Sequence, residues 1–196
     1  MQTLNRAVGL LVAVMAVACG GSAATSGPGG TGKVVKSDAE RFVGSGLSVT
    51  RPQGWSFAPV DSSVSKDAVV VLVGPRAEGK LAAMVELARR PIATADRRRS
   101  PEALLTAISV EMMQAYAACE TTATPTSVTL AGRPGATLKL KLTETLPEGG
   151  EVERVVQLYA TTTDDALIVL RSFLPTDNSS DADLDAILAS LAIEAL

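Results

Sequence analysis

The sequence predicts an α+β fold in which helices pack on a mostly antiparallel β-sheet. Residues 136–143 alternate apolar and polar side chains, which is typical of a strand with one solvated face. Residues 166–173 open with five consecutive apolar residues, which is typical of a buried strand. Helical signals are few, near residues 100–118 and 184–191. A doubly wound parallel sheet needs a helix after nearly every strand, so helices interrupt the strands too rarely for that fold.

The N-terminal segment has the pattern of an export signal. A short polar start carries Arg6, and residues 7–17 are apolar except for Gly9. This run has the length of a signal-peptide core and is shorter than the roughly 20 residues that a membrane-spanning helix needs. Ala18, a small residue, stands directly before Cys19. Cleavage between them would leave the cysteine as the first mature residue.

Residues 16–19 resemble the lipobox of bacterial lipoproteins, with Ala16 where Leu is usual. The resemblance implies that residues 1–18 are a signal peptide and that Cys19 carries acyl chains, which attach the protein to a membrane of the cell envelope. Two or more chains anchor a protein stably. Gly20, in place of Asp, implies the outer membrane, facing the periplasm, in a bacterium with two membranes. The alternative is an ordinary secretory signal in which Cys19 is incidental.

Residues 19–42 are predicted to be a lipidated flexible tether. Residues 20–32 consist of Gly, Ser, Thr, Ala and Pro and show no hydrophobic periodicity. The folded domain is expected to span residues 43–196, which is an ordinary size for one domain. Because aromatic residues make up only 3% of the sequence, the core must be built mainly from aliphatic side chains.

Strands open the folded part. Residues 47–51 alternate and end at a turn over residues 52–55, because Pro restricts φ and Gly permits a tight reversal. Trp55 is expected to fill the core beside this turn. Residues 68–73 are a continuous apolar run, which predicts a buried strand. Residues 81–88 are a third candidate strand.

A helix is predicted over residues 100–118. Ser100 is a favourable N-cap, Pro101 suits the first turn, and the Glu102 carboxylate faces the positive end of the helix dipole. Apolar side chains recur at three- and four-residue spacing on one side of this helix. These side chains belong to Leu105, Ile108, Met112, Tyr116 and Cys119.

The second half predicts four more strands and a closing helix. The strands are residues 128–130, 136–143, 151–161 and 166–173, with the last one central. Turns or loops are expected at residues 133–135, 147–150, 164–165 and 177–181. The closing helix has an apolar stripe made of Leu184, Ile187, Leu188 and Leu191.

Three segments resemble PsbP-like and DcrB-like domains: residues 49–55 (VTRPQGW), 128–136 (VTLAGRPGA) and 183–191 (DLDAILASL). This resemblance implies an α/β/α sandwich around an antiparallel sheet. It implies little chemistry, because many such proteins are envelope lipoproteins and others are accessory or assembly factors. The resemblance carries over no catalytic residues.

Composition excludes several classes of function. A formal net charge of −3 does not favour a nucleic-acid surface, and the absence of histidine removes the commonest general base and metal ligand. With Cys19 acylated, Cys119 has no disulfide partner, and it is expected to be a core or boundary thiol rather than a nucleophile. We expect no enzymatic activity, no metal and no cofactor.

Two short patterns have simpler readings than the chemistry that they suggest. Ser63 and Lys66 have the spacing of penicillin-recognising serine enzymes, but the further elements of those enzymes are missing, which favours a solvated loop. The acidic residues near the closing helix lack the Gly and Glu positions of a calcium loop, and acids are common at helix starts. These are Asp177, Asp181, Asp183 and Asp185.

A run of arginines is the sharpest departure from an ordinary surface. Three of them directly precede the predicted helix, where positive charge is unfavourable. Such a cluster predicts a site for an anionic partner, the alternative being a solvated loop. The candidate residues are Arg89, Arg90, Arg97, Arg98 and Arg99.

The sequence therefore predicts a non-catalytic, lipid-anchored protein of the cell envelope. Its domain is expected to have a binding, accessory or assembly role through a partner protein or an envelope component. The alternative is a carrier that holds a small apolar ligand in a cavity between sheet and helix. A hydrolase is the third and weakest hypothesis.

Overall fold

A computed structural model describes residues 40–62, 65–76, 81–116, 118–145, 149–177 and 180–194. The predicted signal peptide, Cys19 and almost all of the predicted tether lie outside these ranges. The main sheet of the described part is antiparallel, with strand order β3-β4-β5-β10-β9-β8-β6, and β7 also pairs with β8. Its strands are β3 (Ser56–Ala58), β4 (Ala68–Val73), β5 (Met84–Pro91), β6 (Cys119–Thr121), β7 (Thr126–Leu130), β8 (Arg133–Thr145), β9 (Glu151–Thr162) and β10 (Ala166–Pro175).

A second, small antiparallel sheet has the order β1-β2-β11. It consists of β1 (Arg41–Gly44), β2 (Leu47–Thr50) and β11 (Ala192–Ile193), so it joins the two ends of the described chain. Two α-helices complete the described fold, α1 (Pro101–Ala115) and α2 (Asp181–Ser190), and a short 3-10 turn covers Val60–Ser62.

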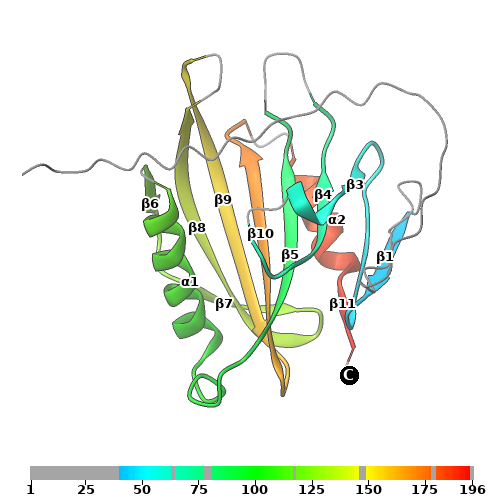
Figure 1. The fold of residues 1–196 in the computed structure, drawn as a ribbon, viewed down its shortest axis with the longest axis vertical. Helices are drawn as coiled ribbons and strands as arrows, with labels where there is room; N and C mark the ends of the chain where they lie inside the picture. The colour runs from blue at the N-terminus through cyan, green and yellow to red at the C-terminus, as the bar shows by residue number, and fades with distance from the viewer. Residues whose placement is uncertain are drawn as a thin grey trace, which may run out of the picture. The chain divides into compact units, whose positions relative to one another are not determined.

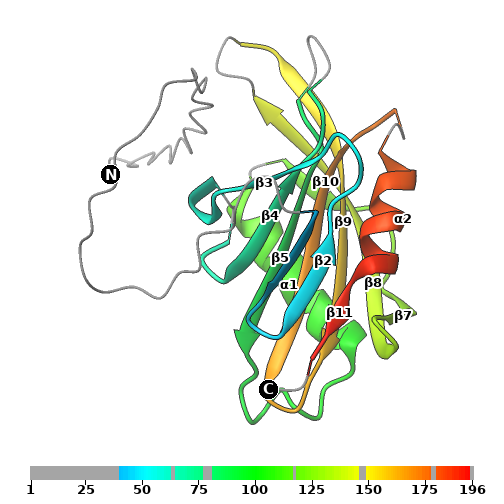
Figure 2. The same ribbon diagram turned by 90° about the vertical axis from the view of Figure 1, so that its right-hand side faces the viewer.

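The helices cover opposite faces of the main sheet (Figure 1). The apolar side of α1, including Leu105 and Ile108, packs on Leu138 and Leu158 of β8 and β9. On the other face, Ile187 of α2 belongs to a second core cluster. Figure 2 shows the small sheet and α2 in front of the main sheet and α1 behind it. The predicted α+β sandwich is thus confirmed, with the small sheet sharing the layer that contains α2.

Strand β10 is central, as its apolar run predicts. It pairs with β5 on one edge and β9 on the other, and each residue from 166 to 174 is buried. A strand covered on both faces can be apolar at consecutive positions, because neither side faces water. The face of β10 towards α1 carries Leu167, Val169 and Phe173, and the opposite face carries Leu170 and Leu174.

The turn predicted at residues 133–135 is wrong. Strand β8 already begins at Arg133, and the reversal occurs at Ala131 and Gly132, whose φ angles are 50° and 74°. Gly135 instead lets β8 lie close to β9, because a Cβ at this position would be 2.7 Å from the Ala160 carbonyl oxygen. Pro134 is tolerated because it stands near the start of the strand.

Several other boundaries differ from the sequence expectation. Strand β5 begins at Met84 rather than at residue 81, and α1 ends at Ala115, so Cys119 belongs to β6. Phe42 lies in the predicted tether, yet it is buried in the core and, as part of β1, pairs with Val49 of β2. The folded part therefore begins before residue 43. The short strands β1, β3, β6 and β11 were not predicted, because segments of two to four residues are too short to show a periodicity.

The face towards α1 contains a buried ion pair. Glu86 of β5 and Arg171 of β10 are directly opposite in the strand register, and their side-chain atoms Oε1 and Nη1 are 2.6 Å apart. The Glu86 side chain is fully buried and that of Arg171 is 6% exposed. A pair held between central strands opposes any slip of register, because a slip would leave both charges buried and unpaired.

We predict that Glu86→Gln destabilises the fold by about 3–5 kcal/mol, because it leaves the Arg171 charge buried without its counter-charge. Urea unfolding, followed by circular dichroism, measures the free energy of unfolding. The matched control is Glu153→Gln, which removes the partner of Lys141 from an exposed pair and should change that free energy far less. Equal stability of Glu86→Gln and the wild type would contradict the assigned role of the pair.

Candidate functional site

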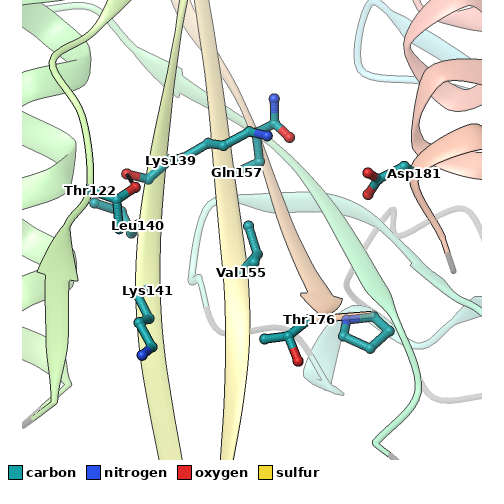
Figure 3. Close-up of a pocket in the computed structure, with 9 residues that line it drawn as sticks. Thr122, Lys139, Leu140, Lys141, Val155, Gln157, Thr176 and Asp181 are labelled. Atoms are coloured by element: carbon teal, nitrogen blue, oxygen red, sulfur yellow. Dashed lines mark hydrogen bonds between the residues drawn. The ribbon is translucent and has the colours of Figure 1, made fainter. Parts of the chain in front are cut away.

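A hollow of about 210 Å³ lies on the face of β8 and β9 opposite α1 (Figure 3). The alternation of β8 creates it: even-numbered residues such as Leu138 and Leu140 pack beneath α1, so Lys139 and Lys141 project to the other side. The start of α2 stands at the far side of the hollow. The lining residues are Thr122, Lys139, Leu140, Lys141, Val155, Gln157, Pro175, Thr176 and Asp181.

Several polar side chains of the hollow already have partners. Lys141 forms an ion pair with Glu153 at 2.6 Å, and this hydrogen bond raises the pKa of the lysine. The Gln157 amide nitrogen donates to the Tyr159 hydroxyl at 2.6 Å. The pKa of the Tyr159 phenol is raised, mainly by burial, so this side chain remains a neutral hydroxyl at ordinary pH. Lys141 and Gln157 are thus held by neighbouring side chains.

Two charged residues of the hollow differ from the others. Lys139 extends across β9 towards Gln157, and Asp181 lies apart from it on α2 (Figure 3). Within the described ranges neither side chain forms an ion pair. The hollow thus presents one free cation and one free anion on different sides.

The carrier hypothesis requires an apolar cavity between sheet and helix. The hollow beside α2 mixes apolar residues such as Val155 and Pro175 with lysine, glutamine, threonine and aspartate side chains, so it is not the apolar cavity that a carrier requires. A second hollow, along the β7–β8 hairpin, is lined by residues that include Ser127, Thr129 and Arg133. Between the layers, the two large core clusters are formed by buried side chains that are mostly aliphatic. No observation on the described residues favours a carrier.

The five candidate arginines do not form one cluster. Arg89 contacts the Asp165 carboxylate at 2.9 Å and donates to the Ser45 carbonyl oxygen at 3.0 Å. Its successor Arg90 forms ion pairs with Glu111 at 3.3 Å and with Asp67 at 3.7 Å. Neighbouring residues of a strand point to opposite faces, so these two guanidinium groups are held apart.

The remaining three arginines lie before α1. Arg99 is held by Asp96 at 2.9 Å and by the Ala103 carbonyl oxygen at 2.9 Å, so it supports the start of the helix. Ser100 caps the helix as predicted, accepting a hydrogen bond from the Ala103 N–H. Arg97 and Arg98 are exposed, and no carboxylate in the described part of the chain pairs with either. They are the arginines still available to an anionic partner.

Other candidate groups have structural surroundings. Asp183 accepts a hydrogen bond from the indole N–H of Trp55 at 2.9 Å, and Trp55 is buried as expected. Ser63 lies outside the described residues. The described residues contain no group of three or more potential metal ligands. Neither described helix has the length and apolar content needed to cross a bilayer.

Cys119 lies on β6 and is half-buried. Burial, followed by the nearby Glu120 carboxylate, raises the pKa of its thiol. A raised pKa reduces the thiolate fraction at neutral pH, which is the opposite of what a nucleophile needs.

Comparison with solved structures identifies the fold. The cyanobacterial PsbP protein CyanoP from Synechocystis sp. PCC 6803 matches with a TM-score of 0.58 and 17% identity, over 84% of this chain and 98% of that chain. LpqN from Mycobacterium tuberculosis, described as involved in cell envelope biogenesis, matches with a TM-score of 0.54 and 13% identity, over 76% and 83%. A protein from Bacteroides thetaiotaomicron matches with a TM-score of 0.50 and 11% identity, over 80% of this chain and 48% of that one.

These likenesses show that the described domain has a PsbP-like fold, as the three sequence segments predict. At such low identities they show the fold alone. No family model matches the sequence, and no curated protein matches it either.

Sequence reasoning did not find the hollow. The alternation of β8 predicts its solvated face, which carries Lys139 and Lys141. The position of Asp181 across from them depends on where α2 packs, and no local pattern encodes that contact.

We predict that Cys119 reacts with Ellman's reagent at pH 8 several-fold more slowly than a small free thiol. The reason is that its raised pKa leaves less thiolate at that pH. A Cys19→Ser background makes Cys119 the only thiol of the chain. Glu120→Gln removes the carboxylate that contributes to the raised pKa and should speed the reaction. In denaturant, Cys119 should react as fast as a small free thiol. A rate above that of the free thiol would reveal an activated cysteine.

Proposed function

We propose that this protein is a non-catalytic, lipid-anchored component of a bacterial cell envelope. In this proposal Cys19 carries the acyl chains, and the PsbP-like domain has an accessory or assembly role through a partner protein or envelope component. The observation that carries the proposal is Cys19 itself, which directly follows a short apolar segment and Ala18. In a bacterium with two membranes, Gly20 favours the outer membrane, facing the periplasm.

The length of the chain between anchor and domain supports this arrangement. Strand β1 begins at Arg41, so about 20 residues rich in Gly and Ser separate it from Cys19. As a random coil such a segment spans about 25 Å, which keeps the domain close to the membrane and leaves it free to turn. The cell-envelope role printed for LpqN, a protein of similar fold, agrees with this proposal.

The chemistry of the domain supports a role without catalysis. The sequence has no histidine, and the thiol of Cys119 is shifted away from reactivity. The most buried ionic groups, Glu86 and Arg171, neutralise each other between two strands. Such a domain acts through its surface, by binding.

We predict that Cys19→Ser releases the protein from membranes, because it removes the atom that accepts the acyl chains. Fractionation of bacterial cells expressing the full chain measures the release, and mass spectrometry of the N-terminal peptide shows whether acyl chains are present on the wild type. Cys119→Ser is the matched control and should stay with the membrane. A Cys19→Ser protein that remains in the membrane fraction, or a wild-type peptide with a bare thiol, would contradict the anchor.

We further propose that Arg97 and Arg98 bind an anionic component of the envelope. The support is their exposure and the lack of a carboxylate partner in the described structure, whereas Arg89, Arg90 and Arg99 are paired. The positive end of α1 follows directly and adds to the local positive potential.

The test is the double variant Arg97→Gln/Arg98→Gln in a full chain carrying Cys19→Ser, mixed with vesicles that contain phosphatidylglycerol. Each arginine near an anionic surface contributes about 1 kcal/mol, so at low salt we expect binding to weaken about 30-fold. Added salt should shrink that difference. Lys66→Gln/Arg76→Gln removes the same charge elsewhere, and an equal loss in that control would reject a specific site.

A further inference from the structure

The two free charges in the hollow beside α2 form a complementary pair of attachment points. Lys139 belongs to β8 and Asp181 to α2, and both line the same space (Figure 3). Lys141, the other charged residue of the lining, is neutralised by Glu153 at 2.6 Å. Among the charged residues that line the hollow, the two without an ion-pair partner therefore have opposite signs.

This arrangement discriminates between classes of ligand. A simple anion such as phosphate would be attracted by Lys139 and repelled by Asp181, and a simple cation would meet the reverse. A molecule that carries both charges satisfies both residues at once, because each of its ends meets an opposite charge. Electrostatics in this hollow thus favours a zwitterion.

Uncharged groups in the hollow suit the same kind of ligand. The Gln157 amide nitrogen uses one N–H towards Tyr159 and carries a second that a ligand can use, and the end of the Lys139 side chain lies near this amide group (Figure 3). Val155 supplies an apolar contact in the floor, and Thr122 and Thr176 supply hydroxyl groups. The volume of about 210 Å³ lies below the range of about 300–1,000 Å³ that drug-sized ligands occupy, so the site suits a smaller molecule.

We propose that the hollow binds a small zwitterion of the amino-acid or short-peptide class. Its carboxylate contacts Lys139 and the Gln157 amide, and its ammonium group contacts Asp181. The inference rests on the proposed binding role and gives that role a ligand. It does not require acylation of Cys19, so its failure and the failure of the membrane anchor are seen in different measurements.

The experiment follows backbone amide chemical shifts of the full chain carrying Cys19→Ser during titration with alanine and with dialanine. We expect saturable shifts around Lys139, Gln157 and Asp181 for at least one of the two, with a Kd of about 1 mM. N-acetyl-dialanine lacks the ammonium group and dialanine amide lacks the carboxylate. Each should bind at least about tenfold more weakly than dialanine, because one attachment point is lost.

Variants of the protein test the same contacts from the other side. Lys139→Gln and Asp181→Asn should each raise the Kd about tenfold, while Lys66→Gln and Asp164→Asn, which change like charges outside the hollow, should leave it unchanged. Both substituted residues of the hollow are exposed, so the spectra of the variants should keep the wild-type pattern elsewhere.

Three results would overturn the proposal. The first is the absence of saturable shifts in the hollow with both ligands. The second is equal binding of the capped and uncapped peptides by the wild-type protein, a comparison that needs no variant. The third is saturable binding of inorganic phosphate that Asp181→Asn strengthens, because this result would make the hollow an anion site.

Discussion

The fold depends on the double-sided burial of β10. This strand has no position between residues 166 and 174 that tolerates water, so both faces of the sheet must be covered where it runs. Helix α1 covers one face, and α2 with the small sheet covers the other. Since β11 closes the small sheet against β2, the cover of the second face brings the last described strand beside one of the first. The Glu86–Arg171 pair then ties β10 to β5 in a single register.

The same constraint explains where the surface remains open. The second cover centres on β4, β5 and β10, and it leaves much of β8 and β9 uncovered beyond α2. On β8 and β9 most of the side chains that face away from α1 are polar, so that part of the sheet tolerates contact with water. The hollow lies on the sheet face opposite α1, where the part that α2 covers meets the uncovered part of β8 and β9. Its lining residues come from several parts of the chain, namely the residue after β6, strands β8 and β9, the end of β10 and the start of α2.

Charged side chains divide into those held by partners within the fold and those without one. Most arginines described in the structure are held by carboxylates or carbonyl oxygens, which makes them part of the scaffold rather than of a binding surface. Among the charges without an ion-pair partner in the described structure are Arg97 and Arg98 in the turn before α1, and Lys139 and Asp181 in the hollow. Cys119, which could have offered chemistry, has a thiol whose pKa is raised by its own surroundings.

Local patterns determined much of the molecule. The alternation of β8, the apolar run of β10 and the Ser100-Pro101 start of α1 each arise from local contacts or from burial of one or both faces, and each was predicted correctly. The short strands β1, β3, β6 and β11 were not, because they lack the alternation that residues 47–51 show. Strand β11 also pairs with a strand from the other end of the described chain, which no local pattern predicts. The turn predicted at residues 133–135 was wrong because Pro134 and Gly135 are typical turn residues, whereas here Gly135 allows β9 to lie close to β8. The arginine run looked like one cluster in the sequence, and only the packing of Asp165, Glu111 and Asp96 against it divided it into paired and free members. The meeting of Lys139 with Asp181 in one hollow was likewise decided by the tertiary structure, because charge alone does not say which distant helix will lie across from a strand.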